Sequence, residues 1–407
     1  MQGIKMKKTK LFGLFSIALA LSATSGLAQA VQNSCSKKPF NPASGNYSQL
    51  VEALQRATNT GVPVTITGDF TISKPITIVV RKDLTVNASG ATFTSATGLD
   101  GDMFSIDAVK SASDQCRYSN KRNANVSWKG GYFEFSKSDN SAVVPIQSLV
   151  PSSRQGVQKT GDALSIRGAW TNGPQRIDNA LVDGVLMRGT LGSDKVFSDA
   201  GGDSGVFMSS VKRGEVRNSE FYGIRDAGIY VSANGQNANM RSEYHLINNV
   251  IKRAFDGISS KRGADGIVMS GNEIVDTAVG LSIKQNLPGR VASNITIENN
   301  EINRSVRAIL LENTRNSKVN NNAIVNLGGK VAGSESALGG GGKYRGVTFE
   351  NLDGTLNQMK NNNFSADGST SQRRNKTVIA LSKQGNAPIS ITGNTYNSYI
   401  DIRSVNE

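Results

Sequence analysis

Cysteine and histidine are nearly absent from this chain, which excludes several kinds of site. The 407 residues include two cysteines, Cys35 and Cys116, and one histidine, His245. A structural zinc site needs a cluster of such ligands at a regular spacing, and the sequence has none. The two cysteines leave two alternatives open, one disulfide or two free thiols.

Long apolar runs are also scarce, and the one that stands out lies at the N-terminus. Four lysines within the first ten residues precede an apolar stretch over 11–21 and an Ala-Gln-Ala sequence at 28–30. This order predicts a secretory signal over 1–30 that is cleaved, so we expect a secreted or periplasmic protein. No later stretch is apolar enough to predict a membrane span.

Acidic residues are outnumbered by basic ones. The formal net charge is +14, and removing the four lysines of the predicted signal leaves +10. An exported basic protein favours a polyanionic partner, and we expect an acidic polysaccharide. The sequence has no nucleic-acid-binding motif, so we expect no nucleic-acid partner, and we expect a monomer.

A five-residue pattern recurs along the second half of the chain. It consists of Gly or Ala, an apolar residue, any residue, an apolar or small residue, and any residue. Its copies begin at Gly205, Gly228, Gly257, Gly280, Ala308 and Gly346. Such alternation predicts strands with one buried face, whose unrestricted positions point outward.

A second pattern is an asparagine followed two residues later by an apolar residue. It occurs at Asn249, Asn272, Asn300, Asn322, Asn362 and Asn394. In three successive repeats, the apolar residue of this second pattern lies seven positions before the first apolar residue of the five-residue pattern, as Ile251 does before Ile258. We interpret these asparagines as turn residues that stack in hydrogen-bonded ladders inside the fold.

Short strands that repeat about every 22 to 30 residues predict an all-β fold, a right-handed parallel β-helix. Leucine-rich repeats need a regular leucine frame that is absent. We expect the solenoid over 62–407, with earlier strands after Asp102 and Asp162. A helix over 47–58, within an N-terminal segment 31–61, is expected to cap the first coil. Insertions over 136–160 and 328–343 are expected to be loops.

The predicted register places charged residues in a column of outward side chains. Equivalent positions on successive coils lie roughly 4.8 Å apart. The column contains Ser209, Ser232, Lys261, Lys284, Glu312 and Glu350. Crowding of like charges favours the uncharged form of a lysine, which can then act as a base. A structural alternative is that the lysines only balance charge, with Glu312 as the partner of Lys284.

Acidic residues precede the same strands. These are Asp203, Asp226 and Asp256, with Arg225 beside the second of them. The candidates for binding substrate are Arg225, Arg253, Arg262, Arg290, Tyr230, Glu312 and His245. His245 is also a candidate base, although a lone histidine is more often structural.

The whole chain resembles the pectate-lyase-like β-helix superfamily, and one stretch resembles the chondroitinase B and alginate lyase family. The sequence from Asp256 to Lys261 is followed, after 23 residues, by Lys284. The resemblance implies that Lys261 is the base, that Lys284 replaces the family's arginine, and that Asp256, with Asp226, binds calcium. A second acidic ligand of the family would fall on Ala254.

The reaction that this resemblance implies is β-elimination on a uronate polymer, in which a base removes the C5 proton while the carboxylate is neutralised. The second expectation is a glycoside hydrolase that uses two of the carboxylates of Asp203, Asp226 and Asp256. The sequence motifs of polygalacturonases and mannuronan epimerases are absent. The third is a non-catalytic surface or matrix protein that binds an acidic glycan.

Overall fold

The computed structural model describes residues 38, 40–108, 123–136, 161–168, 176–189, 203–233, 241–284, 291–327, 344–354, 356–366, 376–381 and 387–397. The predicted signal, both cysteines and Arg290 lie outside the described residues. The same holds for nearly all of the two predicted insertions.

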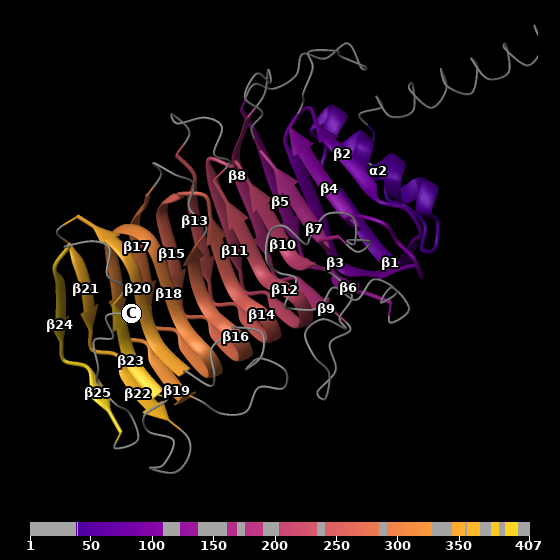
Figure 1. Ribbon diagram of the computed structural model, residues 1–407. Helices are drawn as coiled ribbons and strands as arrows, with labels where there is room; N and C mark the ends of the chain where they lie inside the picture. The colour runs from indigo at the N-terminus through magenta and orange to yellow at the C-terminus, as the bar shows by residue number, and fades with distance from the viewer. Residues whose placement is uncertain are drawn as a thin grey trace, which may run out of the picture.

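Successive coils of the described chain stack along one axis, and each coil adds a strand to three walls (Figure 1). Each strand pairs in parallel with its counterparts on the neighbouring coils. The predicted parallel β-helix is therefore confirmed.

The first wall holds the strands on which the outward column was predicted. It contains β2 (Ile76–Val80), β4 (Phe104–Ala108), β7 (Leu164–Arg167), β10 (Ser204–Ser209), β20 (Tyr344–Asp353), β23 (Lys376–Leu381) and the later parts of β12 (Glu220–Ser232), β14 (Val250–Lys261) and β16 (Glu273–Lys284). The middle of β18 (Glu301–Asn320) continues it between β16 and β20.

The second and third walls complete each coil. The second contains β5 (Asn123–Lys129), β8 (Arg176–Asp183), β11 (Arg213–Arg217), β13 (Glu243–Ile247), β15 (Asp265–Ser270), β17 (Ala292–Glu298), the end of β18, β21 (Asn357–Lys360) and β24 (Ile389–Thr392). The third contains β6 (Tyr132–Glu134), β9 (Leu186–Arg188), β19 (Ala323–Leu327), β22 (Asn363–Ala366), β25 (Thr395–Tyr396) and the beginnings of β12, β14, β16 and β18. β1 (Val64–Ile72) and β3 (Leu84–Ser95) bend across both walls.

The interior is apolar because alternate residues of every wall point into it. Val206, Ile229, Ile258 and Leu281 are register partners on the first wall, and each is fully buried. Burial of a side chain of this size stabilises the fold by about 1.5–3 kcal/mol. The stacked coils therefore share one continuous core.

The predicted asparagine ladder runs along the corner between the second and third walls. The side-chain amide of Asn272 donates to Oδ1 of Asn300 at 2.9 Å, and that of Asn300 donates to Oδ1 of Asn322 at 2.9 Å. The same contacts extend the ladder from Asn249 to Asn394. These buried amides form hydrogen bonds with one another and with the backbone. They therefore fix the register of the coils.

Helix α2 (Tyr47–Thr60) covers the N-terminal end of the solenoid (Figure 1). Its N-cap side chain, that of Asn46, accepts a hydrogen bond from the backbone of Gln49, and Gly61 ends it with φ of 75°. Leu50 and Leu54 are fully buried in the core. The predicted capping helix is confirmed. Within the described part of the chain, no helix is both long and apolar enough to cross a membrane.

Candidate functional site

The lysine column of the first wall has the predicted register. Ser209 pairs with Ser232, Ser232 with Lys261, and Lys261 with Lys284. Glu312 and Glu350 are register partners further along the same wall. The two lysines therefore lie on adjacent coils, β14 and β16.

The two lysines have different partners. Nζ of Lys284 lies 2.5 Å from Oδ2 of Asp256, so its ion pair is with Asp256 and not with Glu312, the partner considered above. Nζ of Lys261 lies 4.5 Å from the centre of the Tyr230 ring. Among the described residues, no carboxylate forms an ion pair with Lys261.

The outward face of these coils is shielded from solvent, although its side chains point away from the core. Lys261 is 5% exposed, and Ser259 and Ser282 are fully buried. Within the described structure, Oδ1 of Asp256 and Oγ of Ser232 are buried and have no hydrogen-bond partner. The site therefore combines low exposure with buried polar atoms that have no hydrogen-bond partner among the described residues.

The three aspartates that precede these strands do not all occupy equivalent positions. Asp203 and Asp226 occupy equivalent positions, because the N–H of Asp226 donates to the backbone oxygen of Asp203 at 2.8 Å. Asp256 is instead the register partner of Ala227, because the pairing of β12 with β14 shifts just before this point. Asp203 forms an ion pair with Arg225 at 2.9 Å. Asp226 and Asp256 are therefore not equivalent residues of successive coils.

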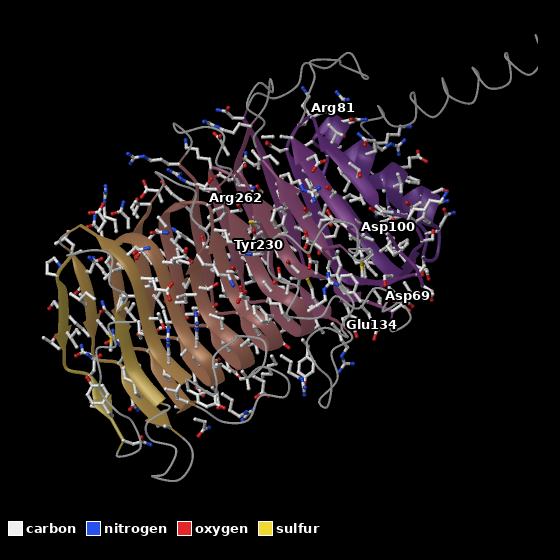
Figure 2. The ribbon with its side chains drawn as sticks, viewed as in Figure 1. Asp69, Arg81, Asp100, Glu134, Tyr230 and Arg262 are labelled. Atoms are coloured by element: carbon white, nitrogen blue, oxygen red, sulfur yellow. The ribbon has the colours of Figure 1, made fainter. Side chains whose placement is uncertain are left out.

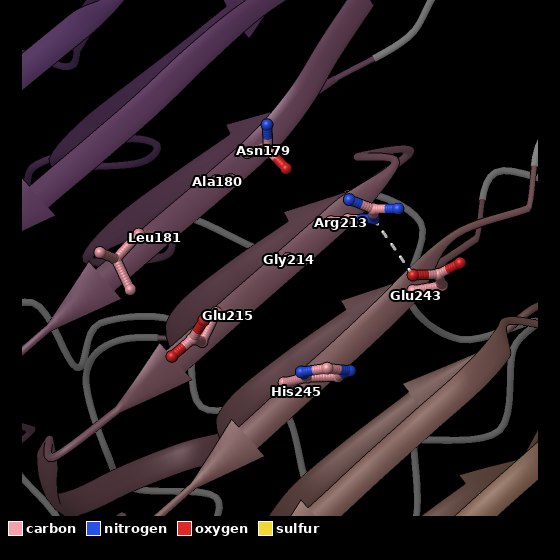
Figure 3. Close-up of a pocket in the computed structure, with 8 residues that line it drawn as sticks. All are labelled: Asn179, Ala180, Leu181, Arg213, Gly214, Glu215, Glu243 and His245. Carbon is pink, nitrogen blue, oxygen red and sulfur yellow. Dashed lines mark ion pairs between the residues drawn. The ribbon is translucent and has the colours of Figure 1, made fainter.

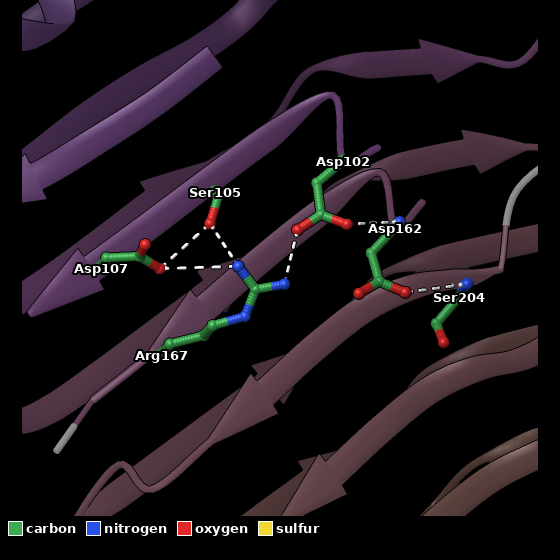
Figure 4. Close-up of polar contacts among 6 residues, drawn as sticks. All are labelled: Asp102, Ser105, Asp107, Asp162, Arg167 and Ser204. Carbon is green, nitrogen blue, oxygen red and sulfur yellow. Dashed lines mark hydrogen bonds and ion pairs between the residues drawn. The ribbon is translucent and has the colours of Figure 1, made fainter. Parts of the chain in front are cut away.

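A second group of carboxyls on the first wall was not singled out from the sequence (Figure 4). The N–H of Asp162 donates to Oδ1 of Asp102 at 3.0 Å, and Oδ1 of Asp162 accepts from the N–H of Ser204 at 3.0 Å. Nη2 of Arg167 lies 2.7 Å from Oδ2 of Asp102, and its Nη1 donates to Oγ of Ser105 at 2.7 Å. Asp102, Asp162 and Ser204 thus bring three coils together.

Burial raises the pKa of Asp162 well above its usual range, and the neighbouring carboxylates of Asp102 and Asp203 raise it further. Two arginines form ion pairs with these carboxylates, Arg167 with Asp102 and Arg225 with Asp203. Asp162 therefore favours its protonated form, which is the form of a general acid. The sequence signal that could have identified this group is the aspartate just before each strand, Asp102 before β4 and Asp162 before β7.

An aromatic pair separates the carboxyl group from the lysines. The rings of Phe207 and Tyr230 stack on adjacent coils with centroids 5.0 Å apart and planes 15° from parallel. The guanidinium of Arg167 lies 5.8 Å from the centre of the Phe207 ring, on the side opposite to Lys261 in the coil order. Figure 2 shows Tyr230 and Arg262 over the middle coils of the solenoid.

Two other predicted substrate residues lie elsewhere. His245 is on β13 of the second wall, where it lines a shallow cavity of about 400 Å³ with Arg213, Glu215 and Glu243 (Figure 3). Arg253 occupies the corner between the third and first walls with a φ of 66°, and its Nε is buried without a partner in the described structure. The structure does not bring His245 to the lysine column.

The described acidic residues do not form a calcium cage. Calcium takes six to eight oxygen ligands, several of them carboxylates. Asp256 is bound by Lys284, and no group of three or more candidate metal ligands occurs among the described residues. Calcium at Asp256 and Asp226 stays a prediction, and no step below depends on it.

Comparison with known proteins identifies the fold. The family model of the right-handed β-helix region matches residues 204–400. Among solved structures, the Dettilon tailspike protein is 14% identical with a TM-score of 0.50, over 89% of this chain and 65% of the tailspike. The surface adhesin PfbA of Streptococcus pneumoniae is 11% identical, with a TM-score of 0.45, over 88% of this chain and 92% of the adhesin.

A family 28 exopolygalacturonase of Yersinia enterocolitica is 12% identical, with a TM-score of 0.43, over 91% of this chain and 78% of the enzyme. No curated protein sequence matches the chain significantly. At these identities the similarity shows the fold alone.

Proposed function

Because the chain is a right-handed parallel β-helix protein, we propose that it is an exported polysaccharide lyase that cleaves a uronate-containing polymer by β-elimination. The observation that carries the proposal is the unequal pair of lysines on adjacent coils. Lys284 is held by a buried carboxylate, whereas Lys261 contacts a tyrosine ring and forms no ion pair with a described carboxylate.

In this mechanism Lys261 is the base. It takes the proton from C5 of the uronate, the electron pair forms the C4–C5 double bond, and the bond from C4 to the glycosidic oxygen breaks. The departing oxygen takes up a proton from solvent and leaves as a hydroxyl group. Lys284 and Arg262 supply positive charge for the uronate carboxylate, whose negative charge grows in the transition state. The ion pair with Asp256 positions the amino group of Lys284.

The export and calcium components of the proposal have separate supports. The basic and apolar segments over 1–30 support secretion or periplasmic delivery. The resemblance of the stretch from Asp256 to Lys261 supports a calcium requirement. Activity that persists in the presence of a chelator would contradict the calcium component without affecting the role of Lys261.

The test is a panel of uronate polymers incubated with the purified protein. Elimination leaves an unsaturated uronate, which absorbs in the ultraviolet. We expect Lys261→Ala to lower this rate by about 10²-fold or more, because a positioned general base contributes that much. Lys252→Ala is the matched control, since Lys252 pairs with Glu273 on the third wall at 3.0 Å and is well exposed. Full activity in Lys261→Ala would exclude it as the base.

Hydrolysis is the second candidate function, and the raised pKa of Asp162 favours it. A glycoside hydrolase needs one acid that donates a proton and one carboxylate that acts as base or nucleophile. In this reaction Asp162 would be the acid, and the carboxyl group of Asp203 or Asp102 would take the second role. The same incubations separate the two reactions, because hydrolysis produces reducing ends without ultraviolet absorbance and would be abolished by Asp162→Asn. Binding of a polymer with neither product supports the non-catalytic alternative.

A further inference from the structure

The second wall has a cavity of its own, on a different face of the solenoid from the lysine column (Figure 3). It has a volume of about 400 Å³ and lies over β8, β11 and β13. Two rows of outward side chains line it. They are Asn179, Arg213 and Glu243 in the first row and Leu181, Glu215 and His245 in the second. Each row covers two coil steps, roughly 10 Å along the axis.

The charged side chains of the cavity keep hydrogen-bonding capacity within the described structure. Arg213 and Glu243 form an ion pair through Nε and Oε2 at 3.3 Å, which leaves the Nη atoms and Oε1 available. Oε1 of Glu215 accepts a hydrogen bond from Nη1 of Arg217 at 2.9 Å, which leaves its Oε2 available. The cavity therefore offers acceptors on two carboxylates and donors on Arg213.

The other side chains add an imidazole, an amide and an apolar surface. His245 is exposed, and no described residue forms a hydrogen bond or an ion pair with its ring. Nδ2 of Asn179 donates to Asn125 at 2.7 Å, so Oδ1 of Asn179 remains an acceptor. Leu181 is half-buried and supplies apolar contact area. An apolar surface with a few convergent polar groups is typical of small-molecule sites, whose volumes are about 300–1,000 Å³.

The charges around the cavity are mixed, and this limits the class of ligand. The carboxylates of Glu215 and Glu243 would repel an anion, and the guanidinium groups of Arg213 and Arg217 would repel a cation. A hydrocarbon would leave the polar groups without partners. A neutral molecule rich in hydroxyl groups meets these conditions, because each hydroxyl can donate to a carboxylate and accept from a guanidinium or an imidazole.

We propose that this cavity binds one or two units of a neutral saccharide, with a ring face against Leu181 and hydroxyl groups on Glu215 and His245. The inference goes beyond the proposed lyase and does not depend on it, because His245 lies on the second wall and Lys261 on the first. A protein with both sites would be held on a neutral glycan while its lysine column faces a separate, acidic chain.

His245 provides a readout for the experiment, since it is the only histidine of the chain. In protein labelled with ¹³C-histidine and prepared without a histidine tag, one imidazole NMR signal reports ligands in the cavity and not ligands on the first wall. The neutral probes are maltohexaose, cellohexaose and xylohexaose. Hexagalacturonate and a chitosan hexamer are the anionic and cationic comparisons.

We expect at least one neutral probe to shift the His245 signal with a Kd of about 1 mM, in keeping with a shallow site that forms a few hydrogen bonds. Each charged probe should bind there at least about tenfold more weakly. Two results overturn the inference. One is the absence of a saturable shift with every neutral probe up to about 10 mM, and the other is a charged probe that binds as tightly as the best neutral one.

Glu215→Gln tests the carboxylate, because it removes the charge and keeps the shape of the side chain. It should weaken binding of the best neutral probe about threefold to tenfold, since a hydrogen bond to a charged group is stronger than one to a neutral amide. Glu298→Gln is the matched control, because Glu298 is a half-buried glutamate on β17 of the same wall and lies outside the cavity. Equal affinities in these two variants contradict the site.

Leu181→Ala tests the apolar contact and should weaken binding about fivefold. Its matched control is Val268→Ala, because Val268 is also half-buried, follows His245 in the same row and lies outside the cavity. Circular dichroism checks that each variant is folded. An affinity in Leu181→Ala that equals that of Val268→Ala contradicts the placement of the ring face.

Discussion

The ion pair between Asp256 and Lys284 makes a quantitative prediction, because one of its members is almost completely buried. Asp256 is 1% exposed, and its Oδ1 has no hydrogen-bond partner in the described structure. Its Oδ2 lies 2.5 Å from Nζ of Lys284 and 3.5 Å from Oγ of Ser282. The carboxylate therefore depends on Lys284 for compensation of its charge.

Replacement of each partner should have a different cost. Lys284→Met leaves a buried carboxylate without its cation and should lower the free energy of unfolding by about 3–5 kcal/mol. Asp256→Asn keeps the shape and removes the charge, while the side chain of Lys284, 14% exposed, retains access to solvent. Its cost should be about 1.5–3 kcal/mol, that of one hydrogen bond to a charged group. The double variant should cost about as much as Asp256→Asn, so the coupling energy should be close to the whole cost of Lys284→Met, about 3–5 kcal/mol.

The assay is urea unfolding of the four proteins, followed by circular dichroism at neutral pH. Lys252→Met is the control, because its pair with Glu273 is exposed and should contribute less than about 1 kcal/mol. Additive costs in the double variant, or a loss below about 1 kcal/mol for Lys284→Met, would show that the buried carboxylate does not depend on this lysine. Either result would refute the assignment of Asp256 as the residue that positions Lys284.

Two further predictions concern the ladder and the carboxyl group. Asn300→Ala removes four side-chain hydrogen bonds and should cost about 4 kcal/mol in urea unfolding, against less than about 1 kcal/mol for the exposed Asn363→Ala; equal costs would contradict a stabilising ladder. Because burial raises the pKa of Asp162, the folded protein retains a proton that the unfolded chain releases above a pH of about 4. The contribution of Asp162 to stability is thus present below that pH and is lost as the pH rises through its raised pKa. Asp162→Asn should remove this loss. The difference in urea midpoint between the variant and the unmodified protein should therefore favour the variant more at pH 7 than at pH 4. A difference that is the same at both pH values would contradict the prediction.

The fold was predictable from the sequence because its determinants are local and repeated. The coils from Asn249 onward share an asparagine that fits the ladder, and most coils have a glycine where the first wall passes close to the next coil. A Cβ at Gly257 would lie 2.5 Å from the backbone oxygen of Gly280, so only glycine fits there. Constraints of this kind recur at fixed distances from the apolar residues, and the pattern therefore predicts the register of Lys261 with Lys284 correctly.

The contacts of the site were less predictable, because they depend on small irregularities. Between Ile224 and Ala227 the chain has two residues, Arg225 and Asp226, where the next coil has only Phe255. This extra residue offsets Asp226 from Asp256, since Asp226 lies two residues before Gly228 and Asp256 only one before Gly257. The sequence contains the offset but does not show that it brings Asp256 to Lys284. Because of this offset, Asp256 forms its ion pair with Lys284 of the next coil and does not align with Asp203 and Asp226.

The carboxyl group of Asp102 and Asp162 shows a different limit, since its members come together only through the stacking of long coils. They are 60 residues apart in the sequence and adjacent in space. Asp162, just before β7, and Lys261 on β14 are separated by three coil steps, roughly 14 Å. That distance is too large for both to act on one glycosidic bond, so the acid and the base proposed here belong to alternative reactions. We therefore expect only one of the two variants, Asp162→Asn or Lys261→Ala, to abolish cleavage. That variant identifies which end of the wall contains the reacting sugar.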